Sequence, residues 1–314
     1  MTIHAHLDTF HGLPVRSVDL DLDPATSSAA PDTVAWRVEA APYDEDEPTL
    51  QQSFEELLGR VDPAGIRALV IGWWGPGWDG MRGDIPVRML ADAAGRLPAL
   101  EAIFLGDIVM EESEISWIEQ DDITPLLDAY PRLRRLEVRG GTGLHLRPVT
   151  HAALEVLRFE TGGLPASVVR AVGESSLPAL RHLELWLGTT NYSGDSRPAD
   201  WAGVLDGSGL PALRHLGLQD SEIQDEVCAA VAAAPIVARL ESLNLSMGVL
   251  TDTGAEALLS GQPLTHLTSL DLSHHYLSGP MIERLRAALP GVELDLSDRQ
   301  QVRGNDWRYV AVSE

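Results

Sequence analysis

The chain has 314 residues, and 44% of them are hydrophobic, which is enough for a large core and excludes wholesale disorder. Its formal net charge of −24 makes nucleic acid and anionic membranes unsuitable partners, because phosphate binding needs clustered Lys and Arg. The single cysteine, Cys228, excludes a disulfide framework and a multi-cysteine zinc site, and its alanine-rich surroundings predict a buried, inert thiol.

The N-terminal region, residues 1–62, is predicted to be a cap. Residues 15–23 and 33–40 alternate apolar and polar side chains, which predicts strands that cover the first edge of a sheet. A helical pattern at 53–61 follows them. The first residues lack the basic and apolar regions of a signal peptide, and no apolar stretch reaches membrane-spanning length. We therefore expect a cytoplasmic protein.

Residues 63–296 are predicted to be leucine-rich repeats. The frame L-x-x-L-x-L occurs eight times, and its middle residues are separated by 21 to 34 positions. The eight frames are Ile66/Leu69/Ile71, Leu100/Ile103/Leu105, Leu133/Leu136/Val138, Leu154/Leu157/Phe159, Leu180/Leu183/Leu185, Leu213/Leu216/Leu218, Leu240/Leu243/Leu245 and Leu267/Leu270/Leu272.

Each frame predicts a short strand with one buried face, and helical patterns lie between the frames. A strand, a helix and a second parallel strand form a right-handed crossover, and stacked units share one core. We therefore predict a single α/β domain over residues 1–314, a leucine-rich-repeat solenoid (horseshoe). About nine parallel strands would line its concave face, with the helices on its convex face. Residues 292–296 are predicted to be the last strand, and 297–314 a C-terminal tail or cap.

Residues that flank the buried pair of each strand face the concave side. The early units carry small or apolar residues there, the middle units carry mixed charges, and the later units carry His182, Glu184, Trp186, His215 and Asp271. Neighbouring strands lie about 4.8 Å apart, so His182 and His215 should be stacked neighbours. Two interpretations stay open: a solvated, self-neutralising face, or a groove that holds a peptide or protein.

Three loops interrupt the repeats. Residues 72–84 place Trp73, Trp74 and Trp78 among glycines, where the rings either bind a partner or plug one end of the concave face. Residues 107–122 are acidic but lack EF-hand spacing, so a solvated loop is favoured over a cation site. Residues 187–201 carry Tyr192 and Asp195 and are expected to lean over the groove.

Catalysis has little support in the sequence. There is no nucleophile elbow, no glycine-rich phosphate loop and no HExxH motif. His274 and His275 follow a strand, where adjacent side chains face opposite ways, so they are not expected to chelate an ion together. We expect no metal and no cofactor.

Several motifs together resemble a family of bacterial cytoplasmic leucine-rich-repeat proteins of uncharacterised activity. They are ALVIGWWG (68–75), EISWIEQDDITPLLDAYPRL (114–133), LWLGTTNYSGD (185–195), LDLSHHYLS (270–278), LPGVELDLSDRQ (289–300) and RYVAVSE (308–314). The resemblance runs over nearly the whole chain. It implies the fold and no activity.

The sequence favours a cytoplasmic interaction module that binds a neutral or basic peptide or protein on its concave face. It would serve, for example, as an accessory to peptide-modifying enzymes. The alternative is a hydrolase or modifying enzyme with a His/Asp site on that face, formed where His182, His215 and Asp271 converge. The predicted partner-binding residues are His182, Glu184, Trp186, Tyr192, Asp195, His215, Asp271, Trp73, Trp74 and Trp78.

Overall fold

The computed structural model describes residues 2–17, 29–40, 48–75, 83–302, 304 and 307–314. These residues form an α/β fold with twelve strands, most of them parallel, and eight α-helices. The chain divides into unit 1 (Met1–Arg147 and His151–Val156) and unit 2 (Pro148–Thr150 and Leu157–Glu314). The division falls inside the predicted repeats, and the expectation of one domain stays a prediction.

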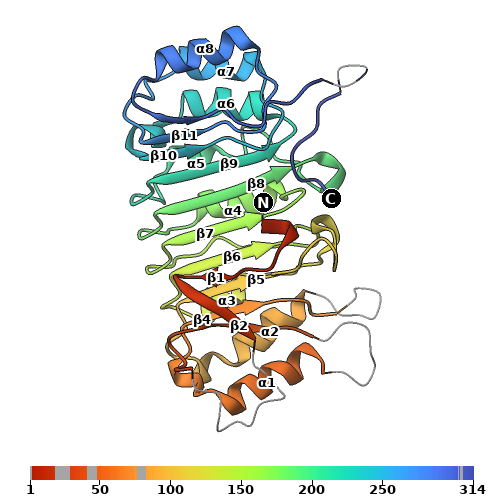
Figure 1. The fold of residues 1–314 in the computed structure, drawn as a ribbon. Helices are drawn as coiled ribbons and strands as arrows, with labels where there is room; N and C mark the ends of the chain where they lie inside the picture. The colour runs from red at the N-terminus through yellow and green to blue at the C-terminus, as the bar shows by residue number, and fades with distance from the viewer. Residues whose placement is uncertain (1, 18–28, 41–47, 76–82, 303, 305–306) are drawn as a thin grey trace. The chain divides into compact units, whose positions relative to one another are not determined.

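In unit 1, strands β2 to β6 follow one another in chain order, and β1 pairs with β2. Figure 1 shows β4, β5 and β6 side by side. β1 is antiparallel to β2, and β2 to β6 pair in parallel. The strands are β1 (Thr9–Phe10), β2 (Leu13–Ser17), β3 (Ala35–Val38), β4 (Ala68–Ile71), β5 (Ala102–Leu105) and β6 (Arg135–Arg139). The predicted pairing of the N-terminal strands with the first repeats is confirmed for β2 and β3, and residues 18–23 of the first predicted strand lie outside the described residues.

Three helices connect the unit 1 strands, namely α1 (Leu50–Arg60), α2 (Asp84–Asp92) and α3 (Thr124–Ala129). α1 begins with a capping box in which Thr49 and Gln52 exchange hydrogen bonds, and it buries Leu50, Phe54 and Leu57. α3 was not predicted, because six residues are too few to show a helical period.

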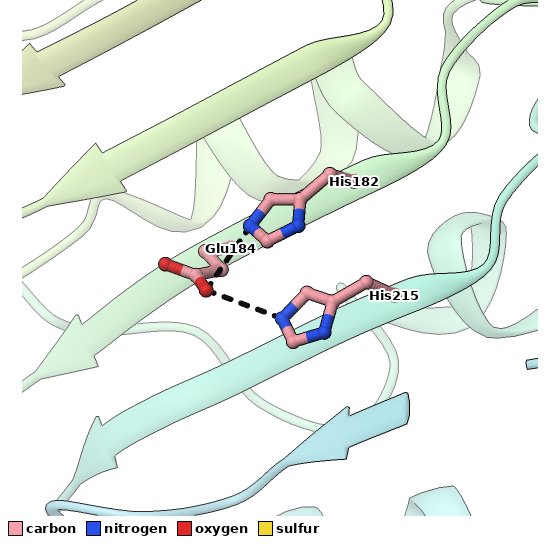
Figure 2. Close-up of side chains that lie close together, drawn as sticks. All are labelled: His182, Glu184 and His215. Atoms are coloured by element: carbon pink, nitrogen blue, oxygen red, sulfur yellow. Dashed lines mark hydrogen bonds and ion pairs between the residues drawn. The ribbon is translucent and has the colours of Figure 1, made fainter. Parts of the chain in front are cut away.

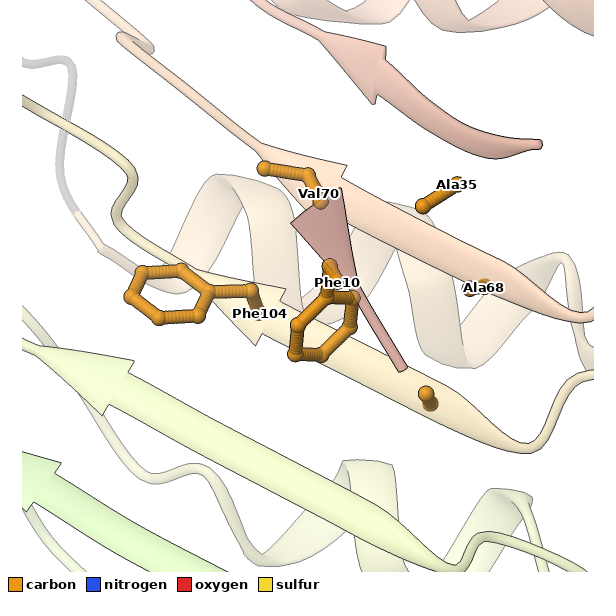
Figure 3. Close-up of a cluster of buried hydrophobic side chains, with 6 residues drawn as sticks. Phe10, Ala35, Ala68, Val70 and Phe104 are labelled. Atoms are coloured by element: carbon orange, nitrogen blue, oxygen red, sulfur yellow. The ribbon is translucent and has the colours of Figure 1, made fainter. Parts of the chain in front are cut away.

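The N-terminal segment covers one face of the unit 1 sheet. Phe10 packs edge-on against Phe104 at 5.8 Å between ring centroids (Figure 3), and Ala68, Val70 and Ala102 belong to the same buried cluster. The small and apolar residues that the sequence places on this face are therefore buried beneath the N-terminal segment and form part of the core. The predicted cap covers this face in addition to the sheet edge, so the face is closed to partners at these residues.

Unit 2 continues the pattern with parallel strands in chain order. Its strands are β7 (Val156–Glu160), β8 (His182–Gly188), β9 (His215–Ser221), β10 (Ser242–Asn244), β11 (Ser269–Asp271) and β12 (Glu293–Asp295). The eight predicted frames coincide with β4 to β11, and β12 lies inside the predicted last strand. The parallel strands are thus confirmed.

The helices of unit 2 pack against one another in sequence, α4 with α5, α6 with α7 and α7 with α8. They are α4 (Ala166–Glu174), α5 (Ala202–Asp206), α6 (Gln224–Ala232), α7 (Asp252–Ser260) and α8 (Gly279–Ala288). Cys228 on α6 is fully buried, as predicted. None of the helices in the described ranges has the length and apolar character needed to cross a bilayer.

The last residues of the chain run back across the strand ends of unit 2 (Figure 1). The carbonyl of Tyr309 contacts His274 after β11, and the Ala311 N–H donates to Met247 after β10. The Val312 N–H donates to Asp220 on β9. The predicted tail is therefore ordered at 307–314, and it straps the loops that follow the strands.

Candidate functional site

The half-buried and exposed residues of β8 to β12 that point away from the leucine core form a surface that we call the open face of unit 2, whereas Trp186 and Gln219 on the same side of β8 and β9 are buried. The pairing of β8 with β9 places His182 beside His215 and Glu184 beside Gly217. Farther along, Asn244 pairs with Asp271. The members of the open face are half-buried or exposed, and they are His182, Glu184, His215, Ser242, Asn244, Ser269, Asp271, Glu293 and Asp295.

A compact cluster forms at one end of the open face. The Nε2 atoms of His182 and His215 lie 3.1 and 3.2 Å from the same oxygen, Oε1 of Glu184 (Figure 2). The two imidazole rings stack at 4.1 Å between centroids with 9° between their planes. The predicted stacking of the histidines is confirmed. It arises because parallel pairing in register places equivalent side chains next to one another.

Two further side chains hold this cluster in place. Nε of Arg158, on β7, lies 2.7 Å from Oε2 of Glu184, the oxygen that the histidines do not contact. Nδ1 of His215 lies 2.7 Å from Oγ of Ser242. Both oxygens of Glu184 and both ring nitrogens of His215 are therefore engaged, which fixes the orientation of each group.

Glu184 is ionised in this environment. Burial alone would raise the pKa of its carboxyl group. The hydrogen bonds from His182 and His215 and the charge of Arg158 outweigh burial and hold that pKa well below its usual range. Glu184 is therefore a carboxylate, and its negative charge is stabilised by contacts with two imidazoles and one guanidinium.

Trp186 is only 2% exposed, although its position on β8 predicts an outward-facing anchor. The guanidinium of Arg158 lies 5.6 Å from its ring centroid, and Nε1 of Trp186 has no hydrogen-bond partner among the described residues. The expectation that Trp186 is free to meet a partner is corrected, because the ring belongs to the packed interior beside the cluster.

The loop after β8 has structural contacts. Oδ1 of Asp195 accepts a hydrogen bond from the Ala166 N–H at 2.8 Å, so it caps the start of α4. The Tyr192 hydroxyl donates to the side chain of Glu314 in the C-terminal strap. These contacts tie Tyr192 and Asp195 to their own unit and away from the histidine cluster.

Asp271 does not join the cluster. It lies three strands from Glu184 in the same row, which is about 14 Å at the usual strand spacing. Its Oδ1 accepts a hydrogen bond from the Ser273 N–H. The convergence of His182, His215 and Asp271 that the enzyme hypothesis requires is therefore absent.

The tryptophans of residues 72–84 belong to unit 1. Trp74 is 3% exposed, and Trp73 is half-buried, with its carbonyl accepting from the Ala40 N–H. Trp78 lies outside the described residues. Trp74 is therefore not available as an exposed binding ring, which corrects that part of the expectation.

His274 and His275 are both buried and structural. His274 contacts Asp298 and the Tyr309 carbonyl, while His275 contacts the Leu296 carbonyl and accepts from the Leu277 N–H. The position of His274 has a positive φ of 56°, so the chain turns there. The two histidines hold loops together and do not face a common point.

The alternation along the strands places Arg158 and Ser242 on this face as well, but the sequence analysis assigned neither to the site. The signal that identifies them is the strand register. Ser242 occupies the same row as His182 and His215 on the next strand, and Arg158, on the preceding strand, contacts Glu184. Residues at equivalent positions of adjacent strands are neighbours in space, although they are far apart along the chain.

His182, Glu184 and His215 also form a set that could hold a metal ion. Their donor atoms all lie within 4.8 Å of one another, and they are the one such group of three found among the described residues. Two imidazoles and a carboxylate are a common ligand set for zinc and other divalent transition metals. The expectation of no metal is thus open to test at this cluster.

No protein-family model matches the chain, and no curated protein matches it. Among solved structures, the chain is similar to the crystal structure of a protein from Bacteroides fragilis, determined by the Northeast Structural Genomics Consortium. The two share 31% identity over 85% of this chain and 73% of that chain, with a TM-score of 0.75. The likeness supports the α/β fold and assigns no activity.

Proposed function

The chain belongs to the same protein family as the Bacteroides fragilis protein, and we propose that it is a leucine-rich-repeat module that binds a basic or neutral peptide segment. The observation that carries the proposal is the contrast between two faces. In unit 1 the segment up to Phe10 covers the sheet, whereas the side chains of the open face of unit 2 are half-buried or exposed. The binding surface is the open face.

The leucine-rich-repeat class is supported by regular units. Each frame contributes one parallel strand whose leucines are buried, as Leu183, Leu216, Leu243 and Leu270 are. Helices follow most of these strands. Stacked strand–helix units with a shared leucine core are what this class of repeat produces.

The charge of the open face favours a basic or neutral segment. Beyond the histidine cluster, Asp271 is half-buried, and Glu293 and Asp295 are exposed. Carboxylates in neighbouring rows attract Lys and Arg side chains and repel acidic ones. An acidic segment is therefore the partner class that this surface disfavours.

Recognition on these strands uses side chains. β8 to β11 are each hydrogen-bonded to a strand on both edges, so their backbones offer no free edge for an added strand. Binding should therefore depend on the identity of the open-face residues and on ionic strength.

Peptide arrays and fluorescence anisotropy test the proposal. The double variant Asp271→Asn/Glu293→Gln removes two charges from the open face. The control Glu174→Gln/Glu226→Gln removes two from exposed positions on α4 and α6. We expect Lys- and Arg-rich peptides to bind the parent and the control equally and the open-face variant several-fold more weakly. Equal losses in both variants, or a preference for acidic peptides, would refute the proposal.

A hydrolase is a second candidate function, favoured by one geometric observation. Oγ of Ser242 lies 2.7 Å from Nδ1 of His215, whose Nε2 lies 3.2 Å from Glu184. A hydroxyl, an imidazole and a carboxylate in this order can activate the hydroxyl as a nucleophile. Hydrolysis of an activated ester by the parent, abolished in Ser242→Ala, is the expected result, and equal rates in both would exclude it.

A further inference from the structure

We propose that His182, Glu184 and His215 form a binding site for a divalent transition metal ion of the zinc class. The site has three protein ligands and leaves a coordination position open. This inference goes beyond the peptide-binding function. It concerns one end of the open face, whereas the charge argument for the peptide rests on the strands that follow.

The distances suit a metal centre. Two donor atoms about 2.0–2.1 Å from a zinc ion, at tetrahedral angles, lie about 3.3 Å apart. Oε1 of Glu184 lies 3.1 Å from Nε2 of His182 and 3.2 Å from Nε2 of His215. An ion can therefore be accommodated once the two imidazole rings, which now stack with 9° between their planes, turn so that both Nε2 lone pairs point at it.

The backbone prepares this geometry. His182 and Glu184 are two positions apart on β8, so they point to the same side, and His215 is the register partner of His182 on β9. The ligands thus come from two hydrogen-bonded strands in the interior of the sheet. Sites built on such rigid elements hold their ligands more precisely than sites on loops.

The neighbouring side chains orient two of the ligands. Arg158 contacts Glu160 at 3.0 Å and Oε2 of Glu184 at 2.7 Å, so one oxygen of Glu184 is held in place while Oε1 faces the imidazoles. Ser242 can accept the Nδ1–H of His215, which directs the Nε2 lone pair toward the ion. Arg158 and Ser242 thus each contact one of the three ligands, as residues that orient metal ligands do.

The side chain of Glu184 packs closely against a glycine, Gly217. A Cβ at Gly217 would lie 2.9 Å from Cγ of Glu184 and 2.4 Å from Nε2 of Gln219. Gln219 is only 3% exposed, and its Nε2 has no hydrogen-bond partner among the described residues. The side chains of Glu184 and Gln219 therefore both pack against Gly217, and a larger residue there would displace Glu184.

The donor set selects the class of ion. Imidazole nitrogens suit zinc, copper, nickel and iron, whereas magnesium and calcium prefer oxygen ligands throughout. Two of the three donors here are imidazoles, so Zn²⁺ and Co²⁺ should bind and Mg²⁺ should not compete with them.

Titration of the chelator-treated full chain with Zn²⁺ and with Co²⁺ tests the site. We expect one equivalent of either ion to bind, and bound Co²⁺ to show the visible ligand-field absorption of a tetrahedral or five-coordinate complex. His182→Ala, His215→Ala and Glu184→Gln should each weaken binding by more than the ~10- to 100-fold typical of losing an outer-shell partner. His266→Ala removes an exposed histidine of the same unit and should bind as the parent does.

A further variant keeps all three ligands. Gly217→Ala places a methyl group against Glu184 and should also weaken binding, while circular dichroism reports whether each metal-free variant is folded. A parent that binds less than one equivalent would overturn the proposal, as would His182→Ala and His215→Ala variants that bind like His266→Ala. Because no peptide is present, these results are independent of the peptide-binding test.

Discussion

Asp220 is a buried acid that faces the C-terminal strap. It is fully buried, its Oδ1 accepts from the Val312 N–H at 3.0 Å, and its Oδ2 has no hydrogen-bond partner among the described residues. Burial raises the pKa of Asp220 well above its usual range, against the smaller opposing effect of the hydrogen bonds from Val312 and Ala311. The strap is therefore held by a carboxyl group that favours its neutral form.

This raised pKa predicts a pH-dependent stability. The folded state binds the proton of Asp220 more tightly than the unfolded state does. Its contribution to stability is therefore complete below the ordinary Asp pKa of about 3.9 and is lost as pH rises through the raised folded value. Asp220→Asn keeps an Oδ1 acceptor and tolerates the positive φ of 56°. We expect its free energy of unfolding at pH 8 to exceed that of the parent, because the amide does not have to lose a proton in the buried site.

Urea unfolding of the parent and Asp220→Asn between pH 5 and 8 measures this difference. The gap should widen as pH rises, whereas Asp206→Asn, at an exposed position on α5, should follow the parent. An Asn variant that is less stable than the parent at pH 8 would contradict the account of Asp220.

Trp186 is expected to contribute to stability because it is buried. Trp186→Ala should lower the free energy of unfolding by about 3 kcal/mol or more, since large-to-small changes in a core leave a cavity. Trp117→Ala, at a position that is 67% exposed, should change it little. A Trp186→Ala variant with parental stability would restore the interpretation of Trp186 as a binding anchor.

At the scale of elements, the N-terminal segment acts as a built-in cover of the unit 1 sheet. Phe10 is 4% exposed, and the Arg135 guanidinium lies 5.3 Å from its ring centroid. Phe10→Ala should cost about 3 kcal/mol of unfolding free energy, the usual range for a buried Phe. Denaturant unfolding measures it, with Met110→Ala, at a position that is 41% exposed, as the control. A loss no larger than in the control would mean that the segment does not stabilise the sheet.

The strands were predictable as elements, whereas the shortest helices were not. Leucines at alternate positions mark β8 and β9 because one face of each strand is buried. α5 has five residues and α3 has six, too few to repeat a 3.6-residue period, so only the structure reveals them.

At the scale of the whole molecule, the leucines of successive repeats in unit 2 pack in one core, so neighbouring repeats of this unit depend on one another. Leu270 is fully buried on β11, and Ser269 beside it is half-buried. Leu270→Asp should place an unpaired charge in the core at a cost of several kcal/mol, a large part of the total stability of about 5–15 kcal/mol. We expect the cooperative thermal transition of unit 2 to be lost, as monitored by circular dichroism and amide hydrogen exchange. Ser269→Asp should melt near the parent, and a Leu270→Asp melt that matched it would contradict the placement of Leu270.

The candidate site was predictable in part. The repeat frame aligns the strands, so it correctly predicts that His182 and His215 are stacked neighbours, and it places Glu184 on the same side of β8. It does not predict that both histidines share one carboxylate oxygen, because side-chain rotamers depend on Arg158 and Ser242 from other strands.

The sequence by itself determined which residues form strands and which face of each strand enters the leucine core, because both follow from a period of two. Only the tertiary structure decided which parts of the other face are covered. Phe10 closes over Ala68 and Ala102, Trp186 is buried, and the C-terminal strap reaches Asp220 from residues far along the chain. Such contacts join segments distant in sequence, and they leave no local periodicity from which they could be predicted.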